Sequence, residues 1–361
     1  MALIVLSFDG VTNTEFEKMA ADAKTYPNIA AFFAKSLYSG PIYSTFVSNT
    51  YPIHTSINTG KHPADHGIIS NLLEEGPDYE VWAQEAALIK SKTILEAATE
   101  KGLDTAAILW PVTCGAKIKW NFPEVHLLPG QKRLIQHLRH GSKWLQIRAL
   151  RRFGHKLKGI NQPFLDDFVS AVAADLISRK HPDLTLVHLL AYDAIRHSVG
   201  MAPPLDAARA SLDESLGRIM AAKRPGDAVL IFSDHGHIDI KHNINLAPIY
   251  GDGLYEQCGG SAFFNEDIKD IKEQEWFARF LTEEEMTRSG YKGRAVMGAA
   301  AKPGYSLSRG RYMANHGYPI DYPDYQVFYA AQGLARGIDN LPFDDIRNVT
   351  AIIQRELELD M

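Results

Sequence analysis

The sequence is poor in cysteine, with only Cys114 and Cys258 among its 361 residues. Two cysteines cannot supply the disulfide framework of a small secreted domain, and neither stands in a Cys-x-x-Cys pair. The low cysteine content suits a reducing compartment. A chain of this length buries a sizeable core without disulfides or a structural metal.

Long apolar runs are also missing. No stretch approaches the roughly 18 consecutive apolar residues that span a membrane. The first ten residues, MALIVLSFDG, contain no basic region, and their apolar run is too short for a secretory signal. We therefore expect a cytoplasmic protein that keeps its own N-terminus and has no membrane partner.

The chain as a whole has no strong excess of charge. Its 38 Lys and Arg residues against 43 Asp and Glu give a net charge of -5, which offers no case for nucleic-acid binding. Residues 131–160 are different, because they hold nine Lys or Arg and no acidic residue. This pattern favours a solvated, basic helical insertion. The alternative is a lid that draws an anionic substrate toward a nearby site.

Five short apolar runs predict strands that are buried on both faces. They are residues 2–8, 104–110, 184–190, 228–234 and 325–332. Helical patterns lie between them, and one begins with the capping box of Thr93 and Glu96. Strands that alternate with helices predict an α/β fold, with a mostly parallel central sheet and helices on both faces. Residues 238–315 show few clear strands, so we expect a small cap within a single domain over 1–361.

Polar residues follow the predicted strands at the edge where ligands bind in such sheets. They are Asp9, Asp193, His197, Asp234 and His235, while His316 lies in a loop near the C-terminus. One such residue alone is usually a cap or a surface group. Several buried carboxylates together cost several kcal/mol in repulsion and desolvation unless cations neutralise them. Mixed Asp and His ligands without Cys suit Zn²⁺ or Mn²⁺, and there are enough for two ions.

The segment around Thr50 allows two interpretations. It is either a surface turn or a nucleophile at the N-terminus of a helix over "TSINTG". A pair of metal ions clamps the attacking and leaving oxygens of a phosphoryl transfer, and such a pair still needs a nucleophile. A hydroxyl beside a metal and a helix N-terminus loses its proton more easily, which favours the second interpretation.

Five motifs in order resemble the type I phosphodiesterase/nucleotide pyrophosphatase family of the alkaline phosphatase superfamily. The first motif is Thr50-Tyr51-Pro52-Ile53-His54, continuing to Thr59-Gly60, Pro63 and His66-Gly67-Ile68. The others are Asp193 to His197, Ser233 to Gly236 and His316 to Tyr318. With Asp9, the matches run over nearly the whole chain. Three positions depart from the family pattern: Tyr51 stands for Phe, Ile53 for Asn, and Arg196 for Gly.

The resemblance implies a role for each matched residue. One metal ion would be held by Asp193, His197 and His316, and the other by Asp9, Asp234 and His235 with the Thr50 oxygen. Asn71 and the Thr50 N–H would donate to a phosphate oxygen. Tyr51 would stack on a nucleotide base, Trp110 would wall the pocket or pack in the core, and Arg196 would contact a substrate anion or lie on the outer face. We interpret His54, His66 and His237 as supporting side chains and not as ligands.

The implied activity is two-metal hydrolysis of a small phosphoester, such as a nucleotide, through a covalent phosphothreonine. Phosphomonoester hydrolysis and phosphonoacetate-type hydrolysis are the alternatives within the superfamily. A sulfatase is excluded because neither cysteine has the Cys-x-Pro-x-Arg context. A protein that binds phosphoesters without catalysis is less favoured, because every matched ligand position and Thr50 are present. The sequence leaves the substrate, the native metal and the oligomeric state open.

Overall fold

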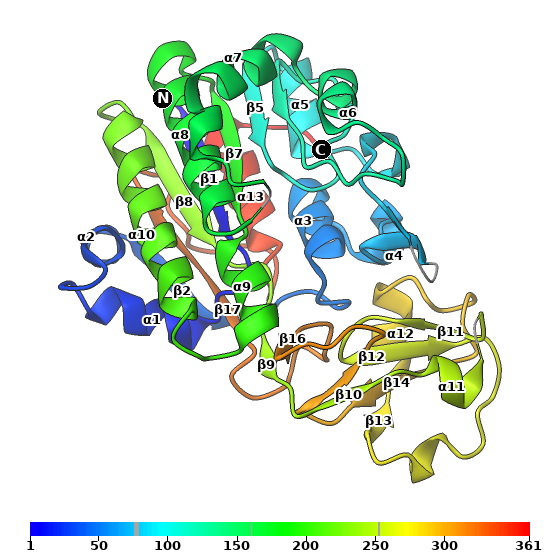
Figure 1. Ribbon diagram of the computed structural model, residues 1–361. Coiled ribbons are helices and arrows are strands. Elements are labelled where there is room, and N and C mark those ends of the chain that lie inside the picture. Colours follow the sequence, from blue (N-terminus) through cyan, green and yellow to red (C-terminus); the bar gives the residue numbers. More distant parts are fainter. Residues whose placement is uncertain (76–78, 160, 252) are drawn as a thin grey trace.

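The computed structural model describes residues 1–75, 79–159, 161–251 and 253–361, and its largest element is a seven-stranded sheet (Figure 1). The strand order is β2-β17-β8-β1-β7-β5-β6. In chain order the strands are β1 (Leu3–Phe8), β2 (Leu37–Ile42), β5 (Thr105–Ile108), β6 (Trp120–Phe122), β7 (Leu184–Leu189), β8 (Ala228–Phe232) and β17 (Val327–Gln332). Strands β8, β1, β7, β5 and β6 are parallel, whereas β17 is antiparallel to β8 and to β2. The predicted α/β fold with a mostly parallel sheet is confirmed.

Helices cover both faces of this sheet because successive residues of a buried strand point to opposite sides. On β1, Ile4 and Leu6 pack into the layer of helices α1 (Asn13–Ala21), α2 (Pro27–Phe33), α8 (Phe164–Lys180) and α10 (Leu205–Ala222). Leu3 and Val5 face α3 (Thr50–Thr59), α5 (Ile94–Glu100) and α13 (Asn348–Leu357). All four side chains are fully buried, and each such burial contributes about 1.5–3 kcal/mol.

The predicted capping box is also confirmed. The Thr93 side chain accepts from the Glu96 N–H while the Glu96 carboxylate accepts from the Thr93 N–H, so the capping box starts α5. The same pair of bonds joins Thr282 and Glu285 at the start of α12 (Glu283–Arg288).

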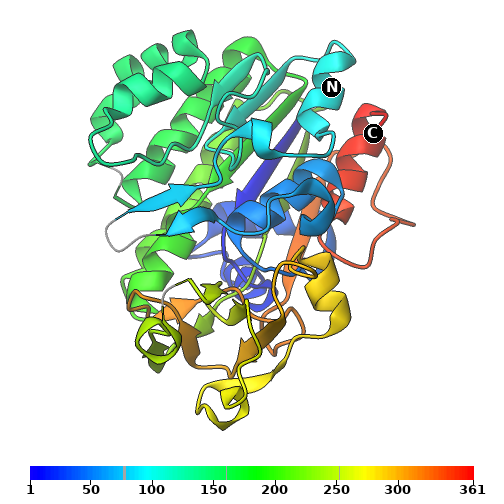
Figure 2. The same ribbon diagram turned by 90° about the vertical axis from the view of Figure 1, so that its right-hand side faces the viewer.

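The prediction of few strands within residues 238–315 is wrong. This region folds into a second lobe, at the lower right of Figure 1, and it contains a four-stranded antiparallel sheet in the order β11-β12-β14-β13. The elements are β9 (Ile238–Asp239), β10 (His242–Ile244), α11 (Ala247–Tyr250), β11 (Tyr255–Gln257), β12 (Ser261–Phe264), a 3-10 turn (Ile271–Glu273), β13 (Phe277–Phe280), β14 (Met297–Ala301), β15 (Tyr305–Leu307) and β16 (Ala314–Asn315). Its strands are short, and the run Gly298 to Ala301 in β14 has no alternation of apolar and polar residues. Figure 2 shows this lobe below the main sheet.

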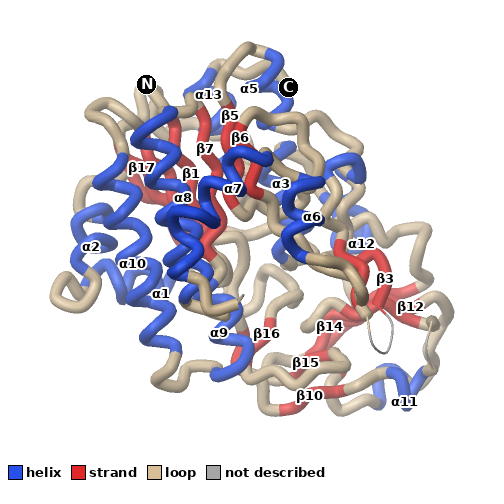
Figure 3. Tube along the Cα trace, turned by 45° about the horizontal axis from the view of Figure 1, so that its top comes forward, coloured by secondary structure: helices blue, strands red, loops and turns tan. Residues whose placement is uncertain are grey.

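The basic segment is helical, as predicted, with α6 (Arg133–His140), α7 (Lys143–Phe153) and a 3-10 turn (Gly154–Lys156). Residue 160, the last of the predicted insertion, lies outside the described residues. Figure 3 shows α6 and α7 on the side of the sheet where β5 and β6 lie.

The remaining elements are α4 (Pro63–His66), β3 (Leu72–Glu75), β4 (Glu80–Trp82), a 3-10 turn (Ala86–Leu88) and α9 (Ala191–Val199). Among the described residues, none of the helices has the length and apolar character needed to cross a bilayer.

Candidate active site

The candidate site lies where three neighbouring strands end. Strands β8, β1 and β7 are adjacent and parallel, so the residues that follow them meet at one edge. Asp9 follows β1, and Asp234 and His235 follow β8. Helix α9 follows β7 and carries Asp193 and His197, which share one face because they are four residues apart.

One group of potential ligands consists of Asp9, Asp234 and His235, whose ligand atoms lie within 4.8 Å of one another. His235 Nε2 is 3.3 Å from Asp9 Oδ1 and 3.4 Å from Asp234 Oδ2. Thr50 Oγ1 lies 3.3 Å from the same nitrogen. The structure thus brings together the residues that the sequence analysis assigned to this metal, including Thr50.

The second group surrounds Asp193 and differs from the prediction. His237 Nε2 lies 3.0 Å, His197 Nε2 3.3 Å and His316 Nε2 3.9 Å from Asp193 Oδ1. Asp193, His197 and His237 form one compact set, and Asp193, His235 and His316 form another. His316 therefore lies between the two groups. His237 is one of the potential ligands, although it was predicted only as a supporting residue.

Four imidazoles in the site share one orientation, with Nε2 toward the carboxylates and Nδ1 toward an oxygen acceptor. The Nδ1 acceptors are the carbonyl oxygens of Ala314 for His197 (2.8 Å), Gly10 for His237 (3.2 Å) and Gly236 for His235 (3.2 Å), and Asn49 Oδ1 for His316 (3.0 Å). Since a carbonyl oxygen only accepts, Nδ1 carries a proton in each ring, and Nε2 of a neutral ring is then free to bind a cation. This is the arrangement of metal-binding histidines, whose second nitrogen donates to an outer partner.

The electrostatics of the site fit bound cations. Burial raises the pKa of Asp9 well above its usual range, and the charges of Asp234 and Asp193 raise it further. Burial also lowers the pKa of His237 to about 4 and that of His316 well below its ordinary value, so both rings are neutral. Four buried atoms, Asp9 Oδ1, Asp193 Oδ1, Asp234 Oδ2 and His237 Nε2, have no hydrogen-bond partner. Unpartnered carboxylate oxygens beside neutral imidazoles fit a pair of divalent cations.

Thr50 is the first residue of α3, and its side chain is buried. Asn49 occupies the N-cap position, but its side chain does not cap the helix and instead contacts His316. Asn49 therefore leaves the Thr50 N–H without a cap, and the positive end of the helix lies beside Thr50. Asn71 Oδ1 accepts from the Tyr51 N–H at 2.9 Å, so the Asn71 amide keeps its NH₂ group for another acceptor.

His188 contacts Asp9, and His54 contacts Thr50. His188 Nε2 lies 2.8 Å from Asp9 Oδ2. His54 lies 2.8 Å from the Thr50 carbonyl oxygen and 2.9 Å from Ser7 Oγ, and burial lowers its pKa to about 3. His188 was not predicted, although an imidazole within the apolar run of β7 was a signal.

For Trp110 and Arg196, the structure favours the second of the two predicted roles over a contact with substrate. The Trp110 ring is fully buried in the core and packs edge-on against His54, with ring centroids 4.9 Å apart. The Arg196 guanidinium donates to Tyr192 Oη and to Asp239, away from the cavity. Arg196 precedes His197, and one residue turns a helix by about 100°, so the two side chains leave α9 in different directions.

The site opens into a cavity of about 1470 Å³ whose lining includes Thr50, Asn71, Asp193 and His197. Trp82 and His126 form an aromatic wall, with rings stacked at 3.8 Å and 6°. Tyr51 touches this wall but is only 1 % exposed. Tyr51 also lines the cavity, but Trp82 and His126 are partly exposed there and present more ring surface.

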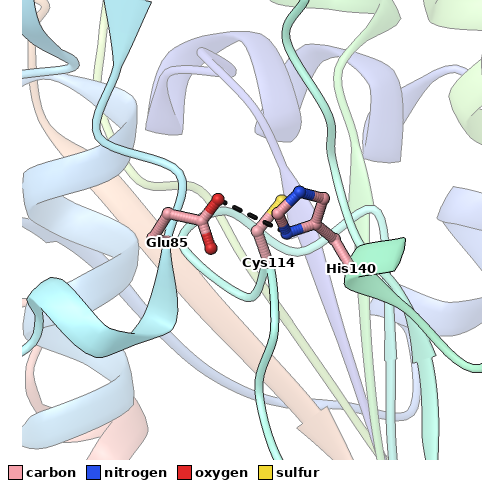
Figure 4. Close-up of side chains that lie close together, drawn as sticks. All are labelled: Glu85, Cys114 and His140. Carbon is pink, nitrogen blue, oxygen red and sulfur yellow. Dashed lines mark ion pairs between the residues drawn. The ribbon is translucent and has the colours of Figure 1, made fainter. Parts of the chain in front are cut away.

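A further group of potential ligands, Glu85, Cys114 and His140, lies apart from this site (Figure 4). His140 Nδ1 is 3.4 Å from a Glu85 carboxylate oxygen, and Cys114 Sγ lies 3.1 Å from the Glu124 carbonyl oxygen. Burial raises the pKa of the Cys114 thiol, so the thiol stays protonated and donates to that carbonyl. Each potential ligand atom has a protein partner, and we assign no cation to this group.

Comparison with known proteins identifies the family. The family model of type I phosphodiesterase/nucleotide pyrophosphatase matches residues 3–318. The chain belongs to this family. The type I phosphodiesterase/nucleotide pyrophosphatase family consists of phosphoric ester hydrolases, as the resemblance of the ordered motifs predicted.

Individual relatives are distant. Ectonucleotide pyrophosphatase/phosphodiesterase 2 of Saccharomyces cerevisiae is 22% identical over 315 residues, which cover 77% of this chain and 58% of that protein. The chain thus spans little more than half the length of this relative. Murine ectonucleotide pyrophosphatase/phosphodiesterase 5 has a TM-score of 0.69 at 16% identity, covering 100% of this chain and 96% of that one. Phosphonoacetate hydrolase of Sinorhizobium meliloti 1021 gives the same TM-score and identity, with 99% and 95% covered. Both structures share the fold.

Proposed function

We propose that the protein hydrolyses phosphodiester or pyrophosphate bonds of small molecules, with Thr50 as the nucleophile. The observation that carries the proposal is the position of Thr50 Oγ1. It lies at the N-terminus of α3, where Asn49 does not cap the helix, and 3.3 Å from His235 within a cluster of buried carboxylates and imidazoles. Such a position favours both an alkoxide and an incoming phosphate.

Two divalent cations, Zn²⁺ or Mn²⁺, fit the donor set. One would be held by Asp9, Asp234 and His235 with the Thr50 oxygen, and the other by Asp193 and His197. His316 and His237 both face Asp193. His316 would be the third ligand of the second cation, and His237 would support this cation or add a further ligand. When bound, such ions neutralise the carboxylates and withdraw charge from the oxygens that attack and leave.

In the first step, the Thr50 oxygen attacks phosphorus, the Thr50 Oγ–P bond forms, and the bond from phosphorus to the leaving alcohol or phosphate breaks. A water molecule then cleaves the phosphothreonine and restores the Thr50 hydroxyl. The Asn71 amide and the Thr50 N–H donate to a phosphate oxygen, where negative charge builds up in both steps. His54 accounts for the placement of Thr50, because it bonds the Thr50 carbonyl oxygen at 2.8 Å.

A nucleotide suits the aromatic wall as the group attached to phosphorus. The stacked rings of Trp82 and His126 offer a flat surface beside Thr50. Stacking of a base on such a ring contributes about 1–3 kcal/mol. An inactive variant of the murine phosphodiesterase 5 has been solved in complex with AMP, which agrees with a nucleotide as ligand of this fold.

Phosphonoacetate-type hydrolysis is the second candidate, favoured by the equal structural similarity to a phosphonoacetate hydrolase in complex with phosphonoacetate. The cavity of about 1470 Å³ is far larger than that substrate needs. Phosphomonoester hydrolysis loses one of its supports, because Arg196 does not reach the cavity.

The test compares three substrates with protein loaded with Zn²⁺ or Mn²⁺. They are a p-nitrophenyl nucleoside monophosphate, p-nitrophenyl phosphate and phosphonoacetate. We expect the highest kcat/KM on the nucleoside diester, and a loss of at least about 10³-fold in Thr50→Ala. Thr55→Ala is the matched control, because Thr55 lies in the same helix and its hydroxyl donates to the Tyr51 carbonyl oxygen. Preference for phosphonoacetate, or full activity in Thr50→Ala, would overturn the proposal.

A further inference from the structure

Helices α6 and α7 expose apolar side chains that no other part of the described chain covers. Trp144 is 80 % exposed, Ile135 57 % and Leu134 52 %. On α7, Trp144, Ile147 and Leu150 follow one another at a spacing of three residues and are all exposed. This spacing places them on one face of the helix. Five exposed apolar residues on two successive helices are unusual for a surface without a partner.

The opposite face of α7 is already used for folding. Leu145 and Ala149 are buried in the main core. Arg148 and Arg152 turn toward α8, where their nitrogens lie 3.0 Å and 3.5 Å from Asp175. The helix is therefore apolar on two sides, and only one of them faces the protein. Its outer stripe is largely exposed, above all at Trp144.

Cations surround this stripe. The exposed basic residues of the segment that have no carboxylate partner among the described residues are Lys132, Arg133, Arg139, Lys143, Arg151 and Lys158. No acidic residue occurs between residues 131 and 160. The whole chain carries a net charge of -5, so the charge of this surface is opposite in sign to the net charge of the molecule. Its field is local and attracts an anionic surface.

We propose that this face of α6 and α7 docks on the surface of an anionic lipid bilayer. Trp144, Ile135 and Ile147 enter the interface between headgroups and acyl chains, while the surrounding Lys and Arg side chains bind the lipid phosphates. A helix surface that combines large apolar residues with basic ones is the kind that lies in the plane of a bilayer. Docking of this kind needs no helix that spans the membrane.

The composition of the face disfavours other occupants. A second copy of the same face would bring together two sets of cations with no acidic residue between them, which costs repulsion. A nucleic acid would use the cations but would leave the aliphatic side chains Leu134, Ile135 and Ile147 without apolar partners. A bilayer satisfies both kinds of residue at once.

Docking would also bring the cavity of the candidate active site to the lipid surface. Leu134 and Leu150 belong to the exposed apolar face, and both also line the cavity. Arg133, one of the exposed basic residues, also lines the cavity. The face and the mouth of the cavity are therefore continuous. The docking proposal does not depend on the proposed reaction, because binding is measured without a substrate.

The test is co-sedimentation of the full chain with vesicles. One set consists of phosphatidylcholine alone, and the other contains phosphatidylcholine and phosphatidylglycerol in equal parts. We expect binding to the anionic vesicles at an ionic strength of about 0.1 M and its loss at about 1 M, where the Debye length falls to roughly 3 Å. Binding to neutral vesicles of equal strength would overturn the proposal, and so would absence of binding to the anionic vesicles at low salt.

Two double variants probe the two kinds of residue. Trp144→Ser with Ile147→Ser removes the apolar contact, and Arg139→Gln with Arg151→Gln removes two cations. Each pair is expected to lower the vesicle partition coefficient by roughly tenfold or more, since one basic residue near an anionic surface contributes about a fivefold change. None of these four residues lines the cavity. Turnover of a soluble ester therefore stays at the wild-type level and shows that the variants fold.

Matched controls lie on other surfaces of the molecule. Val296→Ser changes an apolar residue of the second lobe that is 64 % exposed, and Lys24→Gln with Lys35→Gln removes two exposed cations near α2. Both are expected to bind vesicles as the wild type does. Equal losses in the controls would overturn the assignment to α6 and α7. Two further results would overturn the proposal. A concentration-dependent dimer that Trp144→Ser abolishes would show that a second copy of the chain binds this face. Tight binding to RNA without binding to vesicles would show that RNA binds it.

Discussion

His188 Nε2 lies 2.8 Å from Asp9 Oδ2, and the other ring nitrogen of His188 lies 3.2 Å from the carbonyl oxygen of Leu109. All of these atoms are buried, so the imidazole holds the Asp9 carboxylate in one orientation. The held carboxylate then presents its Oδ1 atom, which has no hydrogen bond, to His235 and Asp234. His188 is thus a positioning residue for a carboxylate that is expected to bind a cation.

His188→Phe is expected to lower the affinity for Zn²⁺ by about 10- to 100-fold, because loss of an outer partner commonly has that effect. Phe keeps the ring that packs against His54, whose centroid is 4.6 Å away. Competition with a coloured chelator measures the affinity. His181→Phe is the control, since His181 contacts Asp227 at 2.9 Å at the far end of β7. Equal affinity in His188→Phe and the wild type would show that Asp9 needs no such support.

The sequence predicted those parts of the site that depend on strand ends and local spacing. Apolar runs located β1, β7 and β8, so Asp9, Asp193 and Asp234 could be placed at one edge. Sequence periodicity does not report which side chains meet across the chain. His188 and His237 were therefore missed as partners, since each contact joins residues that are distant in sequence.

The direction of a side chain on its helix also could not be predicted, so two roles stayed open for Arg196. Arg196 stands beside a predicted ligand, yet it reaches back one turn to Tyr192 on another face of α9. The second lobe was underestimated for a different reason. Its strands contain two to five residues each, and β14 is made mostly of Gly and Ala, so neither length nor alternation marked them. Pairing between strands stabilises them, and pairing is not visible in a local pattern.

Trp82→Ala is expected to raise KM for a p-nitrophenyl nucleoside monophosphate by about 5- to 100-fold while kcat changes little. The reason is that stacking contributes roughly 1–3 kcal/mol to binding and takes no part in bond cleavage. Steady-state kinetics on this ester and on p-nitrophenyl phosphate, which has no base, provide the measurement. Trp144→Ala is the control, because Trp144 lies outside the cavity. A parallel rise in KM on both esters would assign Trp82 to general pocket shape and not to base stacking.

His66 gives a prediction about pH. Its Nδ1 accepts from the Ile68 N–H at 3.2 Å, and burial, followed by the charge of His62, lowers its pKa to about 3. The ring is neutral in the folded protein, whereas an unfolded His titrates near 6.5. Between these values the unfolded state binds the extra proton, so the free energy of unfolding falls as the pH drops below about 6.5.

His66→Gln removes this contribution and keeps an acceptor for the Ile68 N–H. Between about pH 6.5 and pH 5 the wild type is expected to lose about 1.7 kcal/mol more than the variant, because the slope rises from about 0.7 to about 1.4 kcal/mol per pH unit as the unfolded imidazole becomes protonated. Urea denaturation at both pH values, with a chelator present to remove metal effects, measures the difference. His155→Gln is the control, because His155 is exposed on the turn after α7. Identical pH profiles for His66→Gln and the wild type would contradict the prediction.

Gly317 fixes the backbone beside His316. Its φ of +81° is in the left-handed region, and a Cβ atom there would lie 1.6 Å from the Cys258 carbonyl oxygen and 3.0 Å from Asn49 Oδ1. Because the blocking atom is backbone, Gly317→Ala must displace the loop that carries His316. The shift would also break the contact of His316 Nδ1 with Asn49, which orients the ring.

Gly317→Ala is therefore expected to lower the metal content by up to one ion per chain and to destabilise the fold by about 1–3 kcal/mol, the range of local backbone strain. Elemental analysis after gel filtration measures the metal, and urea denaturation measures the stability. Gly154→Ala is the matched control, since nothing lies within 4 Å of its Cβ position and its φ is negative. Two tightly bound ions and wild-type stability in Gly317→Ala would contradict the prediction. They would mean that the loop accepts the extra Cβ atom without moving His316, so that the metal site does not depend on this turn.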